Sequence, residues 1–141
     1  MAQVPHRPHP ACYLCYACKG DLSKATKEQR ELVLDAAWEG CEMLKAAHIP
    51  VDDKENTDCY RVGTPGRRKM DAMLLAICKT PLGRLCVSDH AMHAVAEMQY
   101  LDEAFEGLRA KTQTRMTAWD TLRGQMPSWD IMRKKTAKTR R

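Results

Sequence analysis

The sequence predicts an all-α protein, a small helical bundle with one long C-terminal helix and an N-terminal metal-stabilised Cys/His loop. Apolar residues recur at helical spacing along most of the chain, and no alternating strand pattern persists. Nine Met and few β-branched residues favour helix over strand. The 141 residues suffice for one core, which we divide into a metal-binding arm (1–21), a helical domain (22–126) and a basic tail (127–141).

The first predicted helix begins after Thr26. Thr26 and Gln29 have the spacing of a capping box, in which the two side chains satisfy each other's backbone N–H groups. The helix should continue to about Ala47, because Pro50 follows closely. Its apolar residues share one face, which predicts that this helix packs on the core: Leu32, Val33, Ala36, Ala37, Cys41, Met43, Leu44 and Ala47.

An acidic loop over residues 50–64 separates this helix from the next. Thr64 followed by Pro65 is the pattern of an N-cap with proline in the first helical position, which predicts a second helix to about Lys79. Thr80 and Pro81 repeat the pattern and begin a third, short helix.

The last predicted helix is the longest, from about Asp89 to Gly124, with Ser88 as its N-cap. A heptad pattern of apolar residues runs through it but weakens at Thr112 and Arg115. Pro127 should end it.

The first twenty residues are rich in proline, histidine and cysteine, and we expect no regular structure where they begin. His6, His9, Cys12, Cys15 and Cys18 recur at every third position. Thiolates and imidazoles are the preferred ligands of zinc, and two cysteines separated by two residues can bind one ion. The pattern therefore predicts a structural zinc site that orders this segment.

A second group of metal-binding residue types lies near the start of the long helix. Cys86, His90, His93 and Glu97 are spaced so that they share one helical face. We therefore expect the metal to join the chain's beginning to this helix. The predicted ligands come from these two segments: Cys12, Cys15, Cys18, Cys86, His90 and His93.

Other interpretations of the cysteines stay open. Three cysteines at this spacing with one distant cysteine also hold many [4Fe–4S] clusters, and Cys41, Cys59 or Cys86 could be the fourth ligand. The histidines favour zinc. A Cys-rich arm without a metal is the plainer alternative, and Cys41 and Cys78 fit simple core positions.

Two basic segments suggest contact with an anionic partner. Arg67, Arg68 and Lys69 lie in the first turn of a predicted helix, where the helix dipole disfavours cations unless an anion such as a phosphate binds there. The alternative is that acidic residues of the same molecule, in 52–58 or 87–108, neutralise them.

The C-terminal segment is the most basic part of the chain. Residues 109–141 contain ten basic and two acidic residues. Polybasic tails bind nucleic acid by releasing counterions. The predicted contacts of the tail are its six basic residues: Arg133, Lys134, Lys135, Lys138, Arg140 and Arg141.

Common catalytic motifs are absent from the sequence: it has no phosphate-binding glycine loop, nucleophile elbow or HExxH motif. We expect no enzymatic activity, with a metal-dependent activity as the alternative. No apolar run reaches the roughly 18 residues of a membrane span, and no signal-peptide core occurs near the beginning. We therefore expect no membrane partner and an intracellular location, cytoplasmic or, in a eukaryote, nuclear.

These observations favour a small, zinc-stabilised regulatory protein that binds nucleic acid, or a nucleic-acid-associated complex, through its basic segments. The first alternative is a protein–protein adaptor or inhibitor whose long helix presents Met116, Trp119 and Met126 to a partner. The second alternative is an iron–sulfur redox or sensor protein.

Overall fold

The computed structural model describes residues 9–50, 59–84, 87 and 90–139, and the regular elements within these ranges are all helical. The all-α class is thus confirmed. In chain order the elements are α1 (Pro10–Ala17), the 3₁₀ turn η1 (Leu22–Lys24), α2 (Lys27–Ala46), α3 (Pro65–Lys79), α4 (Pro81–Arg84), α5 (His90–His93), α6 (Val95–Thr112), α7 (Thr117–Gly124) and α8 (Trp129–Thr139).

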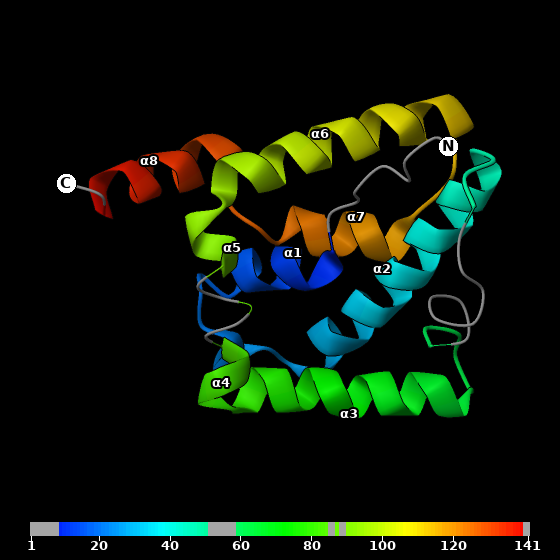
Figure 1. Ribbon diagram of the computed structural model, residues 1–141, viewed down its shortest axis with the longest axis horizontal. Helices are drawn as coiled ribbons and strands as arrows, with labels where there is room; N and C mark the ends of the chain where they lie inside the picture. Colours follow the sequence, from blue (N-terminus) through cyan, green and yellow to red (C-terminus); the bar gives the residue numbers. More distant parts are fainter. Residues whose placement is uncertain (1–8, 51–58, 85–86, 88–89, 140–141) are drawn as a thin grey trace.

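The helices form a bundle with α6 and α3 along opposite edges (Figure 1). α1 and α7 pack against each other between these edges, and α2 crosses the molecule in contact with α3, α6 and α7. α8 packs beside α6 and extends away from the other helices, so that the C-terminus projects from the body. Of the helices described, none is both long and apolar enough to cross a membrane.

The predicted boundaries of the first helices are confirmed. At the start of α2, Thr26 Oγ1 accepts a hydrogen bond from the Gln29 N–H at 3.1 Å, and Gln29 Oε1 accepts one from the Thr26 N–H at 3.0 Å. Thr64 Oγ1 accepts a hydrogen bond from the Arg67 N–H at the start of α3. Pro81 begins the short α4. These local rules hold because each cap is decided by residues within one turn.

The expected single helix from Asp89 to Gly124 is divided in the structure. Ser88 and Asp89 lie outside the described residues. α5 and α6 are separated at Ala94, and α6 ends at Gln113, which adopts a left-handed conformation with φ of 54°. The chain then reverses, and α7 packs back against α2 and α1, while side-chain contacts such as the Phe105–Trp119 stack join it to α6.

The reason for this reversal is visible in the heptad pattern. The apolar seam fails at Thr112, where the chain turns, and Thr112 Oγ1 lies 2.7 Å from Thr114 Oγ1 within the turn. Beyond the turn, Met116, Trp119 and Leu122 are all completely buried. Burying these large side chains against α2 gains more than continuing a helix with a weak seam would.

The expectation that the N-terminal segment is an irregular loop is also wrong for the described part. Pro10–Ala17 is a helix with proline in its first position, and His9 Nδ1 accepts a hydrogen bond from the Ala11 N–H at 3.1 Å. Tyr13, Leu14 and Tyr16 of this helix are at most 1% exposed. Burial of these side chains holds α1 on the core, and a further contribution from a metal stays a prediction.

The centre of the core is aromatic. The Trp119 ring stacks on Phe105 with a centroid separation of 4.7 Å and meets the edge of Tyr13 at 5.3 Å. These three residues come from α7, α6 and α1. Gly40 in α2 lies against the same ring, since a Cβ at position 40 would approach Trp119 Cζ3 to 3.3 Å. Trp119 therefore brings α1, α2, α6 and α7 together at one point of the core, while α2 is the helix that contacts most of the others.

Candidate nucleic-acid interface

The basic C-terminal segment is a helix in the structure, although its sequence suggested an unfolded tail. α8 begins after Pro127, and Ser128 Oγ accepts a hydrogen bond from the Ile131 N–H at 3.3 Å. An isolated helix of this length is marginal in water, so α8 needs contacts with the body of the protein.

Those contacts come from Trp129 and Met132, which lie one turn apart on α8. Met132 is 5% exposed, and the Trp129 ring meets Tyr16 of α1 edge-on with a centroid separation of 5.7 Å. Tyr16 is fixed in turn, because its hydroxyl donates to the Ala91 carbonyl of α5 at 2.8 Å. The base of α8 is thus held by residues from near the beginning and from the middle of the chain.

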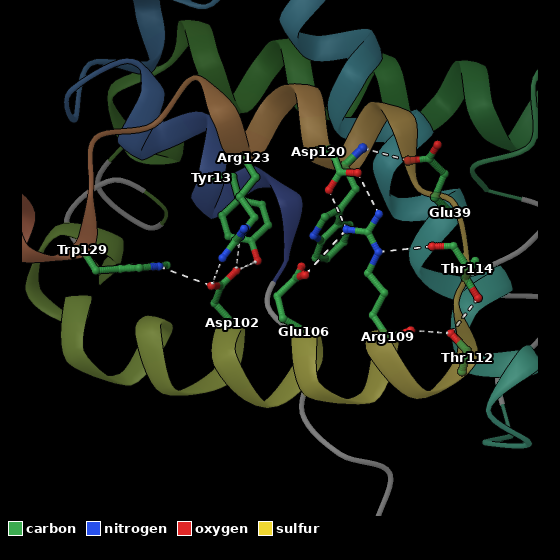
Figure 2. Close-up of polar contacts among 11 residues, drawn as sticks. Tyr13, Glu39, Asp102, Glu106, Arg109, Thr112, Thr114, Asp120, Arg123 and Trp129 are labelled. Carbon is green, nitrogen blue, oxygen red and sulfur yellow. Dashed lines mark hydrogen bonds and ion pairs between the residues drawn. The ribbon is translucent and has the colours of Figure 1, made fainter.

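A buried carboxylate completes this attachment (Figure 2). Asp102 of α6 is completely buried and accepts hydrogen bonds from Tyr13 Oη, from Arg123 Nε and Nη2 at 2.8 and 2.7 Å, and from Trp129 Nε1 at 3.3 Å. One side chain therefore joins α6 to α1, α7 and α8. The pairing raises the pKa of Arg123, and burial together with the neighbouring Asp102 charge raises the pKa of Tyr13 well above its usual range.

Further polar contacts hold α7 in register along α6 and α2 (Figure 2). Arg109 binds Asp120 through both guanidinium nitrogens at 2.5 and 2.7 Å, and its Nε donates to the Thr114 carbonyl. The hydrogen bonds from Arg109 hold the pKa of Asp120 below its usual value. The Glu39 carboxylate of α2 accepts the N–H groups of Ala118 and Trp119, and so caps the start of α7.

Trp129 and Met132 anchor one side of α8, and the basic side chains that the structure describes on this helix are exposed. Arg133, Lys134 and Lys135 are all exposed, and Arg133 forms an ion pair with Asp130 at 2.6 Å. Lys138 lies one turn beyond Lys134 on the same side of the helix axis, but its side chain is outside the described structure. Arg140 and Arg141 also lie outside the described residues. Because consecutive helical residues are about 100° apart, the described cations of α8 spread around the exposed side of a helix that projects from the body.

The structure separates the roles of the basic residues at the start of α3, which the sequence had grouped as one candidate site. The Arg67 guanidinium donates to Asp35 Oδ1 at 2.7 Å and to the Tyr60 carbonyl at 2.9 Å, and its side chain is only 14% exposed. Arg67 therefore joins α3 to α2, which favours neutralisation within the molecule at this position. Arg68 and Lys69 remain exposed. The acidic residues 52–58, expected as neutralising partners, lie outside the described structure.

The three cysteines of the predicted metal site lie along one side of α1, because a spacing of three is close to one helical turn. Cys15 is completely buried, Cys18 is 9% exposed and Cys12 is partly buried. Burial raises the pKa of the Cys12 and Cys18 thiols. The small apolar side chain of cysteine fits these core positions, as it does at Cys41 and Cys78.

Of the other predicted ligands, His90 and His93 are described, and they lie on α5. His90 and His93 are both exposed on α5, which packs against α1, whereas His6 and Cys86 lie outside the described residues. Within the described structure, no group of three or more His, Cys, Asp or Glu side chains comes close enough to hold a metal ion. The beginning of the chain does contact α5, and the Tyr16–Ala91 hydrogen bond forms part of that contact, but a metal link between the two segments stays a prediction.

Sequence reasoning missed the residues that position α8. Asp102 was an acidic residue among several, and only its place among the apolar positions of α6, four residues after Met98 and three before Phe105, signalled that it is buried. Trp129 and Met132, spaced by three after a Pro-Ser pair, signalled an anchored helix. Comparisons of the chain with protein-family models, with curated proteins and with solved structures find no match.

Proposed function

We propose that this protein binds nucleic acid through α8, as a small regulatory protein that contacts phosphates without reading base sequence. The observation that supports the proposal most is that α8 is anchored on one side by Trp129 and Met132 while Arg133, Lys134 and Lys135 remain exposed. A helix held in this way carries its cations on an already ordered backbone, so less backbone freedom is lost when phosphates bind.

The charge pattern favours a polyanion over a discrete acidic ligand. Residues 129–141 contain six basic residues and one acidic residue. A pocket of about 250 Å³ in the described structure lies elsewhere, beside Cys18 and Gln29. Cations along a projecting helix suit the repeating charges of a nucleic-acid backbone.

The test is a salt titration of binding to a fluorescent oligonucleotide of mixed sequence, in single- and double-stranded form. We expect the logarithm of the association constant to fall linearly with the logarithm of salt concentration, with a slope of about −3 to −5 for the wild-type chain. The triple variant R133Q/K134Q/K135Q should reduce the magnitude of the slope by about 2 to 3, because each lost cation releases one counterion fewer.

A matched control separates this contact from net charge. The triple variant K19Q/K24Q/K27Q removes three exposed cations from the region around η1 and the start of α2, far from α8 in the chain, and should leave the slope unchanged. Binding that does not respond to salt, or that is equally weak in both variants, would exclude α8 as the interface. No binding to either oligonucleotide, with retention of an acidic protein partner instead, would favour contact with a nucleic-acid-associated complex.

Zinc binding remains a separate proposal, with a [4Fe–4S] cluster as its alternative. It rests on the cysteine and histidine spacing, because α1 owes its order in the structure to apolar burial. Elemental analysis after anaerobic purification tests it: one zinc per chain, lost in a Cys12→Ser variant, would support it. Absence of both zinc and iron would leave Cys15 and Cys18 as core residues.

The adaptor alternative needs a different surface from the one first expected. Met116 and Trp119 are completely buried, so they are not available to a partner in the folded protein. A protein partner would have to use exposed helix faces.

A further inference from the structure

α3 and α6 lie at opposite edges of the molecule (Figure 1). The outward side of each helix has a distinctive composition. Only Leu74 and Cys78 of α3 are buried, although the helix has 15 residues. The residues of α3 that point away from the body are small or basic, and all are exposed: Arg68, Lys69, Ala72, Ala76 and Lys79. Met73 and Leu75, on either flank of the two alanines, are 49% and 40% exposed.

The outward side of α6 has the opposite charge. Between Ala96 and Gly107, the residues that point away from the core are small, acidic or aromatic: Ala96, Glu97, Tyr100, Glu103, Ala104 and Gly107. The exposed Lys111 follows one turn later, beyond this stretch. Tyr100 is 70% exposed. A Cβ added at Gly107 would meet nothing within 4 Å, so this side of α6 is open.

The two faces match in length as well as in charge. Arg68 to Lys79 and Ala96 to Gly107 each span about 16 Å of helix. On α6 an acidic residue lies about one turn on each side of Tyr100, and on α3 basic residues lie on each side of Ala72 and Ala76. Small side chains allow helix axes to approach to about 8 Å, and the space among four side chains of one helix accepts a side chain of the other.

We infer that the α6 face of one copy of this chain binds the α3 face of a second copy. Tyr100 inserts among Ala72, Leu75 and Ala76, while Glu97 and Glu103 approach the cations of α3. A symmetric pairing of α6 with α6 would place Glu97 and Glu103 against their own copies, and α3 with α3 would oppose cations. Charge therefore selects the head-to-tail contact. Because the two faces are at opposite edges, each copy can bind two others, and the contact does not close into a dimer.

The association should be weak. A single helix pair buries less than the roughly 800 Å² per partner of a standard stable interface. We expect a monomer at low micromolar concentration and chains of copies at about 100 µM and above, dissociating as salt is raised from about 50 to about 500 mM.

The test is sedimentation velocity of nucleic-acid-free protein over a concentration series, with two charge-reversed variants. In E97K/E103K both faces are basic, and in R68E/K69E both are acidic. Each variant alone should associate at least about 10-fold more weakly than wild type. An equal mixture of the two should associate again, to within about 3-fold of wild type, because each face of one variant now complements the opposite face of the other.

Control variants separate this contact from an effect of net charge and from a role of α8. K24E/K27E changes net charge as much as R68E/K69E does, at exposed positions outside both faces, and should associate like wild type. The variant R133Q/K134Q/K135Q should also associate like wild type, so a failure of nucleic-acid binding leaves this test unaffected. Thermal unfolding checks that each exposed substitution leaves the fold intact.

Three outcomes would overturn the inference. One is a monomer at all concentrations. Another is a dimer that R68E/K69E leaves unchanged, which would show that α6 binds itself or another surface. The third is loss of association in the α8 variant, which would assign the partner of the α6 face to the basic helix.

Discussion

Asp102 is the residue on which the arrangement of four helices depends most directly. It is completely buried and pairs with Arg123, whose side chain is 36% exposed. Burying a charge is costly unless its partners are present, so this carboxylate is stable only together with the donors of α1, α7 and α8. The carboxylate therefore selects one packing of these helices over others in which it would be unpaired.

The substitution Asp102→Asn should destabilise the protein by about 3 kcal/mol, because it removes the charge that Arg123 needs and replaces an acceptor with a donor. Urea denaturation followed by circular dichroism measures the loss. Asp130→Asn is the matched control, since its ion pair with Arg133 is exposed and should contribute less than about 1 kcal/mol. Equal losses in the two variants would contradict the assigned role of Asp102.

Glu39 of α2 is a second residue that joins helices, because its side chain caps the start of α7. Its carboxylate accepts two N–H groups at the start of α7, at 3.1 and 2.8 Å, where the helix dipole favours negative charge. Glu39→Ala should cost about 1–2 kcal/mol. Glu42→Ala, which removes only an exposed pair with Lys45 on the same helix, should cost less than about 0.5 kcal/mol, and a reversed order would argue against the cap.

At the scale of the element, α1 carries several groups that ionise only with difficulty. Burial raises the pKa of Cys12 and Cys18 above 9.0, and burial is also the main cause that raises the pKa of Tyr13 and Tyr16 above 10.0. A group with a raised folded-state pKa contributes full stability below its unfolded-state pKa and loses it as pH rises further. The docking of α1 should therefore weaken in alkali.

We expect the free energy of unfolding to stay level between about pH 7 and 8 and to fall above about pH 9, first through the thiols and then through the phenols. Urea denaturation at a series of pH values measures this. Tyr16→Phe keeps the ring contact with Trp129 and should reduce the alkaline slope by up to about 1.4 kcal/mol per pH unit. A slope that is the same in wild type and variant would show that Tyr16 ionises equally in both states.

The stability of α8 depends on the contacts of its first turn, which Trp129 and Met132 make. Trp129→Ala removes the ring contact with Tyr16 and the hydrogen bond to Asp102, and leaves Met132 as the main anchor. Because a helix of 11 residues is marginal alone, amide exchange in residues 133–139 should become at least about 10-fold faster, while α2 should stay protected. Trp129→Phe, which keeps a ring, should have a smaller effect.

The elements differ in how far local sequence decides them. α2, α3 and α4 begin where their Thr caps and prolines predict, because a cap needs only its own first turn. The helical state of α1 and α8 does not follow from local sequence, because their stability comes from Tyr16, Trp129 and other contacts with residues far along the chain. The reversal at Gln113 escapes prediction for a related reason: the weak seam is visible in the sequence, but its alternative partner, α2, is not.

The candidate sites divide in the same way. Arg133, Lys134 and Lys135 can be proposed as anion-binding residues from the sequence alone, because a run of basic residues is visible without knowledge of the fold. Arg67 cannot be assigned from sequence, because its pairing with Asp35 depends on how α3 lies on α2. The regular spacing of Cys12, Cys15 and Cys18 suggests ligands, and it also fits one side of a helix in the core.

At the scale of the whole molecule, α2 supplies the most buried residues of the described helices, and Trp119 of α7 lies at the aromatic centre of the core. Trp119→Ala should cost about 3–5 kcal/mol, because the ring contacts Phe105, Tyr13 and Gly40 at once. This is a large part of the roughly 5–15 kcal/mol by which small domains are stable. Thermal unfolding measures it, with Trp129→Ala as the comparison, and a smaller loss at Trp119 than at Trp129 would show that the core is centred elsewhere.

The packing of α1 against α7 has a consequence for the growing polypeptide. Trp119 is added 106 positions after Tyr13, its ring partner. At about 5–20 residues per second, the ribosome needs roughly 5–20 s to supply the second half of this contact. During that time α1 can pack on α2, but the side of α1 that meets α7 has no native surface to cover it. A stalled or truncated nascent chain is therefore exposed to chaperones, proteases and aggregation before its core can close.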